Sequence, residues 1–205
     1  MFFSFICIEV VIQIPADEEL IEEIKSGSQA AMEVLVKRHY KQIFAYIYRT
    51  VSDYHTAYDL TQEVFIKMMQ SIDRYQGKGK FPNWLITIAV NHCRDYFRSR
   101  HFQQKEQEQE LQKYITDRRE NVWDLLSKKW DSEQVKRAIE SLPSFQREAI
   151  VLRYFHDYKI KEISEITDAK ESTVKSRIRQ GTIKLKRMLE GGHRDHEVKG
   201  RRSNE

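Results

Sequence analysis

The strongest constraint on this chain is that apolar residues recur every three or four positions, with very few glycines and prolines between them. Only 7 glycines and 3 prolines occur in 205 residues, too few for the tight turns of an all-β fold. A spacing of three and four is the period of a helix with one buried face. We therefore predict an all-α protein of long helices and short loops, with the charged residues, 32% of the chain, on the outer faces.

A first helical unit is predicted at 17–100. Proline and a cluster of carboxylates precede or open its first helix at Asp17, and Gly27 permits that helix to end. Two more helices follow, and a fourth is predicted from Asn83 to about Arg100. The third helix is expected to bury the side chains of Leu60, Val64, Phe65, Met68, Met69 and Ile72.

Three other segments have different patterns. Residues 1–16 are apolar, but a stretch of about fourteen such residues is too short to span a bilayer and lacks the parts of a signal peptide. An upstream extension or mis-set start codon is the first interpretation, and a membrane or partner anchor is the second. Residues 101–132, rich in Gln and Glu, are interpreted as a charged linker, or as an extension of the fourth helix. The polar tail at 191–205 is predicted to be disordered.

A second helical unit, predicted at 133–190, ends in a helix-turn-helix pattern: "YKIKEISEI", a break at "TDAKE", and the basic stretch "STVKSRIRQGTIKLKRML". Six basic and two acidic residues within 171–190 give a local net charge of +4. The first turns of such a second helix enter the major groove, where Arg, Lys and Gln read base edges. A solvated charged face is the alternative. The candidate reading residues are Ser172, Thr173, Lys175, Ser176, Arg177, Arg179 and Gln180.

A second polar row shares one face of the predicted fourth helix. Its members, three or four positions apart, are Asn83, Thr87, Asn91, Arg94 and Arg98. Just before or at the start of this row come Tyr75, Lys78, Lys80, Phe81 and Trp84. Aromatic rings interleaved with cations suit single-stranded nucleic acid, and packing into the core is the alternative for Phe81 and Trp84. Promoter opening needs two surfaces together, one for duplex DNA and one for opened strands.

Over about 17–190 the chain resembles the extracytoplasmic-function (ECF) sigma factors of bacterial RNA polymerase. The resemblance is carried by "AYDLTQEVFIKMMQSIDRYQGKGKFPNWLITIAVNHCRDYFR", the charged linker, "AIESLPSFQREAIVLRYF" and "IKEISEITDAKESTVKSRIRQGTIKLKRML". It implies two domains. Sigma region 2, at 17–100, would bind core polymerase and recognise and melt the −10 element. Sigma region 4, at 133–190, would recognise the −35 element.

The resemblance also implies partners and their contacts. The segment "DLTQEVF" matches the part of region 2 that binds the polymerase clamp helices, which assigns that contact to Asp59, Gln62 and Glu63, above Leu60 and Val64. The polymerase flap, promoter DNA as duplex and as non-template strand, and an anti-sigma protein are the other implied partners. The chain is then expected in the cytoplasm, held at the membrane only if an anti-sigma partner holds it there. Asp168 and Ser164 depart from the glycine and alanine usual in the family.

Neither a cofactor nor a metal, a small-molecule substrate or catalysis is expected. Cys7 and Cys93 have no metal-binding spacing, and Cys93 on an apolar stripe is interpreted as a core residue rather than as a metal ligand beside His92 and His101. A stand-alone helix-turn-helix regulator is the main alternative function. A nuclease, which would need clustered carboxylates or histidines, and an interaction module that does not read DNA are the others.

Overall fold

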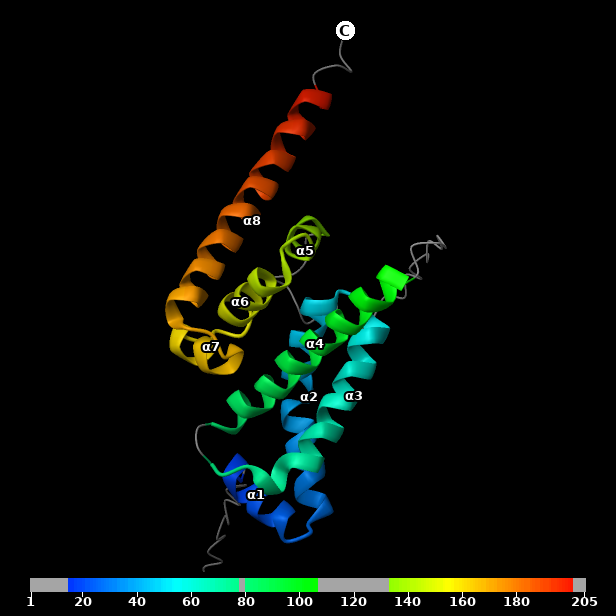
Figure 1. Ribbon diagram of the computed structural model, residues 1–205, viewed down its shortest axis with the longest axis vertical. Helices are drawn as coiled ribbons and strands as arrows, with labels where there is room; N and C mark the ends of the chain where they lie inside the picture. Colours follow the sequence, from blue (N-terminus) through cyan, green and yellow to red (C-terminus); the bar gives the residue numbers. More distant parts are fainter. Residues whose placement is uncertain (1–14, 78–79, 107–132, 201–205) are drawn as a thin grey trace, which may run out of the picture.

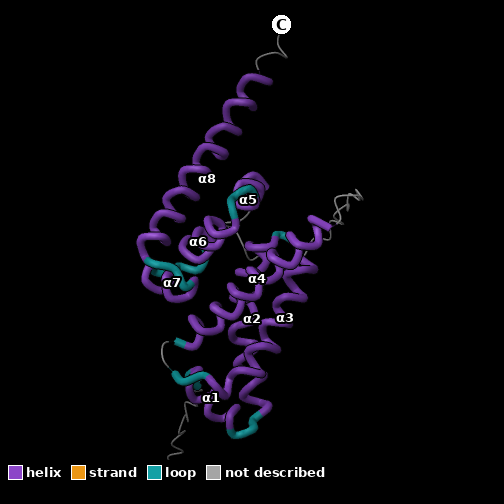
Figure 2. Tube along the Cα trace, in the orientation of Figure 1, coloured by secondary structure: helices purple, strands orange, loops and turns teal. Residues whose placement is uncertain are grey.

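The computed structural model describes residues 15–77, 80–106 and 133–200, and every element within these ranges is helical (Figures 1 and 2). In chain order the elements are α1 (Asp17–Lys25), α2 (Gln29–Val51), α3 (Tyr54–Ser71), the short 3-10 helix η1 (Ile72–Arg74), α4 (Phe81–Glu106), α5 (Glu133–Glu140), α6 (Ser144–Tyr154), α7 (Ile160–Thr167) and α8 (Glu171–Gly200). The all-α prediction is confirmed.

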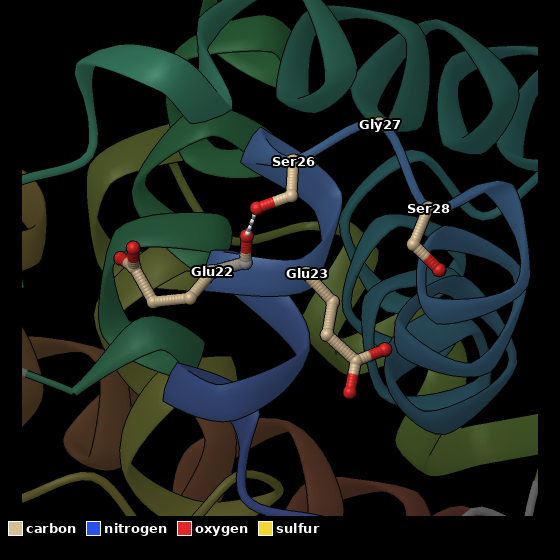
Figure 3. Close-up of a pocket in the computed structure, with 5 residues that line it drawn as sticks. All are labelled: Glu22, Glu23, Ser26, Gly27 and Ser28. Carbon is tan, nitrogen blue, oxygen red and sulfur yellow. Dashed lines mark hydrogen bonds between the residues drawn. The ribbon is translucent and has the colours of Figure 1, made fainter.

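Side chains cap the starts of α1 and α2, the two helices joined by the first corner. The Ala16 backbone N–H donates to Glu19 Oε2 at 3.0 Å at the start of α1, and Ser28 Oγ accepts from the Ala31 N–H at 3.2 Å at the start of α2. Gly27 between them has a φ of +96°, which a side chain would strain. The open hollow at this corner is lined by Glu22, Glu23, Ser26, Gly27 and Ser28 (Figure 3).

The second corner, between α2 and α3, is equally short. Ser52 has a left-handed φ of 63°, and Asp53 Oδ2 accepts from the Thr56 N–H at 2.7 Å to cap α3. The short connection makes α2 and α3 antiparallel neighbours, and Figure 1 shows them side by side with α4. This arrangement fixes which face of α3 remains outside.

The first unit, α1 to α4, packs around a core of aromatic and aliphatic side chains. Its most deeply buried members include Leu35, Ile43, Tyr46, Ile47, Met68, Phe81, Leu85 and Ile86. The predicted core of the third helix is confirmed for Leu60, Val64, Phe65, Met68 and Ile72. It is wrong for Met69, which is 42% exposed because α2 and α4 contact a narrower face of α3 than the apolar pattern covers.

The second unit, α5 to α8, packs α5, α6 and α7 against one side of the long α8 (Figure 1). Ile139, Ile150, Leu152, Ile163 and Val174 are almost fully buried in it. The unit also lies against the first one: α7 contacts α4, and α5 and α6 contact α2. Apolar side chains of both units join one continuous core.

Two helices run further than their sequence patterns predicted. Helix α4 begins two residues before Asn83 and continues to Glu106, past the expected start of the linker at residue 101. Helix α8 continues to Gly200 rather than ending at Gly191. The predictions for residues 1–14, including Cys7, and for 107–132 lie outside the described residues. No helix in the described ranges combines the length and the apolar character needed to cross a membrane.

Candidate nucleic-acid interface

Helices α7 and α8 form the predicted helix-turn-helix. The turn depends on Asp168, whose φ of 49° and ψ of 50° are left-handed, a conformation that Asp adopts more readily than most residues. Ser164 Oγ donates to the Ala169 carbonyl at 2.6 Å, so the serine adds a hydrogen bond that an alanine could not make. Val174, fully buried, then fixes the rotation of α8.

This rotation turns the candidate duplex-reading side chains outward. Six of them are exposed: Ser172, Thr173, Lys175, Ser176, Arg179 and Gln180. We call these six, with Arg177, the α8 row. Arg177 is half-buried, and its guanidinium lies 4.7 Å from the centre of the Phe145 ring. Gln146 Nε2 donates to Gln180 Oε1 at 2.9 Å, so α6 positions two members of the row.

Gly181 explains how α8 approaches α6 so closely, a contact that the sequence analysis missed. A Cβ atom at this position would lie 2.8 Å from Ile150 Cγ1, closer than side chains in real proteins approach. A glycine in the middle of a helix costs about 1 kcal/mol relative to alanine, so its presence there was the sequence signal that could have predicted the close contact. Close packing against Ile150 is the reason for it.

The polar row on α4 is in a different setting. Asn91 and Arg98 are exposed, and Asn83, Thr87 and Arg94 are half-buried; we call these five the α4 stripe. Thr87 Oγ1 donates to the Asn83 carbonyl at 2.7 Å, and Arg98 forms an ion pair with Asp95. All five lie on one long helix, as the spacing predicted.

Arg94 is engaged by the second unit. Its Nε and Nη2 donate to the two carboxylate oxygens of Glu148 on α6, both at 2.8 Å, and Nη2 also donates to the Thr167 carbonyl at 3.1 Å. Glu148 is 5% exposed. Burial lowers the pKa of the Arg94 guanidinium, but the carboxylate of Glu148 raises it more, so the net pKa lies above its ordinary value.

The aromatic residues before the stripe form a packed cluster. The ring centres of Tyr75, Phe81 and Trp84 lie 5.2 to 5.6 Å apart. Phe81 is fully buried and Tyr75 is 7% exposed, whereas Trp84 is half-buried. Lys80 is exposed, and Lys78 lies outside the described residues. Stacking of these rings on bases stays a prediction, with Trp84 the most accessible of the three.

The candidate polymerase face lies on α3. Asp59, Gln62 and Glu63 are exposed, and Leu60 and Val64 are buried beneath them, as expected. Tyr58, Ile66 and Met69, each more than two-fifths exposed, add apolar surface to the same helix. This is the mixture of charge and apolar area found where a protein binds another protein.

His92 on α4 contacts charged side chains of this face, which sequence reasoning did not predict. The Lys67 ammonium lies 2.7 Å from His92 Nδ1, and His92 Nε2 lies 2.7 Å from Glu63 Oε2, although that second contact is not aligned as a hydrogen bond. His92 follows Asn91 in the chain but points inward and is 8% exposed. The only sequence signal for this position was that His92 follows the apolar Ala89 by three residues, which places both on the same side of the helix.

Two family models match the chain in the order of its two units. Sigma-70 region 2 matches residues 35–103, and Sigma-70, region 4 matches residues 132–185. The chain is 30% identical over 176 residues to the ECF RNA polymerase sigma factor SigW of Bacillus subtilis, covering 82% of this chain and 94% of that protein. It is 31% identical over 169 residues to the ECF RNA polymerase sigma-E factor of Escherichia coli K12, covering 79% and 88%.

Solved structures support the fold. The sigma factor RpoE in complex with the anti-sigma factor NepR, from Bartonella quintana, matches 76% of this chain and 94% of its own with a TM-score of 0.64 at 21% identity. CnrH in complex with the cytosolic domain of CnrY matches 86% and 99% with a TM-score of 0.62 at 22% identity. The two family models match in the order of the two units. The relatives, which match over most of their length, and the fold agree with the same family. The chain therefore belongs to the ECF sigma factors, the promoter-specificity subunits of RNA polymerase.

Proposed function

We propose that this chain directs core RNA polymerase to promoters by reading two promoter elements with two different surfaces. The α8 row reads the −35 element as duplex DNA in the major groove. The α4 stripe and the loop before it recognise the −10 element and hold its opened non-template strand. The proposal is carried by one observation: a single chain presents two separate polar and basic rows, each on a long helix whose opposite side is buried.

The free energy needed to open a promoter requires the polymerase as a partner. Opening five base-pair steps costs about 7 kcal/mol at about 1.4 kcal/mol per step. Stacking two captured bases on aromatic rings returns about 2–6 kcal/mol. The chain therefore cannot hold an opened promoter by itself, and the contacts of core polymerase supply the difference. Catalysis of RNA synthesis belongs to the polymerase, and this chain carries none.

The α3 face gives the polymerase a place to bind. Asp59, Gln62 and Glu63 contact the clamp helices, with the exposed Ile66 and Met69 adding apolar contact area. The second unit contacts the polymerase flap, which holds the α8 row at the upstream element. Because polymerase and promoter DNA are in the cytoplasm, the chain acts there. As with the complex of RpoE and NepR, an anti-sigma protein is a further partner.

A stand-alone helix-turn-helix regulator is the second candidate. It would use the α8 row but would need neither the α4 stripe nor the carboxylates on α3. The two candidates differ most clearly in whether binding to polymerase precedes recognition of DNA.

The deciding experiment mixes the purified chain with core RNA polymerase. Co-migration and run-off transcription from a library of promoter fragments are expected, and the transcribed fragments would give the promoter consensus. Binding to DNA fragments without any association with polymerase would instead make the chain a stand-alone regulator.

A further inference from the structure

The candidate polymerase face on α3 carries a carboxylate and an ammonium group one helical turn apart. Glu63 and Lys67 are separated by four residues, with the glutamate first, which is the spacing and order at which these side chains pair best on a helix. Both residues are exposed. A direct pair would place a cation against the carboxylate that Glu63 offers to polymerase.

An equivalent pair on α2 has this direct arrangement. Glu33 and Lys37 have the same spacing and are both exposed, and the Lys37 ammonium donates to Glu33 Oε1. Lys37 lowers the pKa of the Glu33 carboxyl, first through this hydrogen bond and second through its charge. The pair on α3 is different, because within the described residues Glu63 and Lys67 form no ion pair with each other.

His92 on α4 lies against both charged groups of α3. Helices α3 and α4 pack on one another, and Figure 1 shows them side by side. The Lys67 ammonium lies 2.7 Å from His92 Nδ1, and Glu63 Oε2 lies 2.7 Å from His92 Nε2. Because His92 is only 8% exposed, the packing of α4 fixes its position. The ring therefore holds Lys67 with one nitrogen and faces Glu63 with the other.

The chemistry of the ammonium group assigns the proton on the imidazole. An ammonium has donors only, so His92 Nδ1 accepts from Lys67 and carries no proton. The proton of the neutral ring is then on Nε2, the nitrogen that faces Glu63. This contact is not aligned as a hydrogen bond, and 56% of the Glu63 side chain stays exposed. The carboxylate is therefore held near the ring but is available to a partner.

We propose that His92 is a positioning residue of the polymerase face: it holds Lys67 away from Glu63 and so keeps the carboxylate available to a basic side chain of core polymerase. The inference rests on the proposed contact between Glu63 and polymerase. Asp59, one turn earlier and also exposed, adds a second carboxylate, which favours a basic partner. Without the imidazole, Lys67 would pair with Glu63 as the equivalent residues do on α2, and polymerase would have to displace it.

The test measures the affinity of the labelled full chain for core polymerase by fluorescence anisotropy. His92→Leu should lower this affinity about 1.4- to fivefold, the loss expected for one exposed ionic contact. Adding Lys67→Met to His92→Leu should restore the affinity, because the competing cation is gone. Lys37→Met is the matched control: it removes a lysine of the same spacing from α2 and should restore nothing.

A glutamine at position 92 gives the conservative comparison. His92→Gln keeps an acceptor for Lys67 and a donor for Glu63 on one side chain, so the affinity should stay close to that of the unmodified chain. A loss in His92→Leu that Lys67→Met does not relieve would mean that His92 only supports the packing of α4. That result would overturn the proposal, as would an unchanged affinity in His92→Leu when Glu63→Ala binds more weakly.

A second measurement needs no polymerase. The nitrogen chemical shifts of the imidazole distinguish a proton on Nε2 from one on Nδ1, and the Nε2 form of His92 is expected in the unmodified chain, with a weaker preference in Lys67→Met. A proton on Nδ1 would overturn the proposal even if His92→Leu did not fold. A chain with the Nε2 form that does not associate with polymerase would retain this arrangement and lose the sigma-factor assignment.

Discussion

Arg179 on α8 and Arg94 on α4 occupy similar positions in the sequence pattern, because each lies on the polar side of a long amphipathic helix. Arg179 is exposed. Arg94 is held by two hydrogen bonds to a carboxylate of the other unit. The local spacing of apolar residues determines which side of a helix faces away from the core of its own unit. It does not determine whether another part of the chain covers that side. Substitutions in one row at a time should separate these two effects.

The largest effect is expected for Arg94→Ala. The substitution leaves the nearly buried Glu148 carboxylate without its cation, at a cost of about 3–5 kcal/mol that separation of the units relieves. Amide hydrogen exchange should therefore accelerate over α6 and α7. Arg98→Ala is the control, since its side chain is 81% exposed and pairs with Asp95 on the same helix. Equal exchange in the two variants would mean that the ion pair does not hold the units together.

Acid should also weaken the contact between the two units. His156 packs edge to face on the Tyr46 ring of α2 and lies near Arg49 of the same helix, with Asp157 adjacent in the chain. Burial first, and the Arg49 charge second, lower the pKa of His156 from 6.5 to about 4. The contact between the two units holds His156 neutral, so the stability of this contact falls as pH drops from about 6.5 toward 4.

The distance between the two units, followed over this pH range, checks the effect. Carboxylates also titrate near the lower end of the range, so His156→Asn provides the comparison that isolates the histidine. Opening that begins near pH 6 in the unmodified chain and is delayed to lower pH in His156→Asn is expected. Identical pH profiles would exclude His156 as the responsible group.

The sequence could predict the structural features that depend on residues close together in the chain. The helical period located the core of α3, and the break at Asp168 located the helix-turn-helix, because both signals lie within one turn or one corner of the chain. It could not predict the docking of Glu148 on Arg94, because complementary charges 54 residues apart leave no periodic signal. Nor could it predict the surroundings of Phe145, which is 51% exposed and contacts two arginines at the edge of the contact between the units.

Arg179→Ala tests the exposed row with a smaller expected effect. Loss of a bidentate contact to a base costs about 1–3 kcal/mol, so affinity for the upstream promoter element should fall about 5- to 150-fold and the preference at one base pair should relax. Arg187→Ala, about two turns later on the same helix and also exposed, should weaken binding to all sequences alike and reduce the salt dependence. Titration of matched and mismatched duplexes at several salt concentrations distinguishes the two. A uniform loss in both variants would place Arg179 against phosphate rather than bases.

The smallest effect is expected for Glu63→Ala, on the face that docking leaves open. Glu63 has 56% of its side chain exposed, and exposed ionic contacts contribute about 0.2–1 kcal/mol, so affinity for core polymerase should fall about 1.4- to fivefold. The distance between the units and the binding of upstream duplex should stay unchanged, because Glu63 contacts His92 and lies away from the Arg94–Glu148 pair. Fluorescence anisotropy with labelled chain and core polymerase measures the first quantity. If polymerase affinity stayed the same while the units moved apart, His92 would be transmitting changes on α3 to the α4 stripe, and the polymerase face and the docked face would be one coupled surface rather than two independent ones.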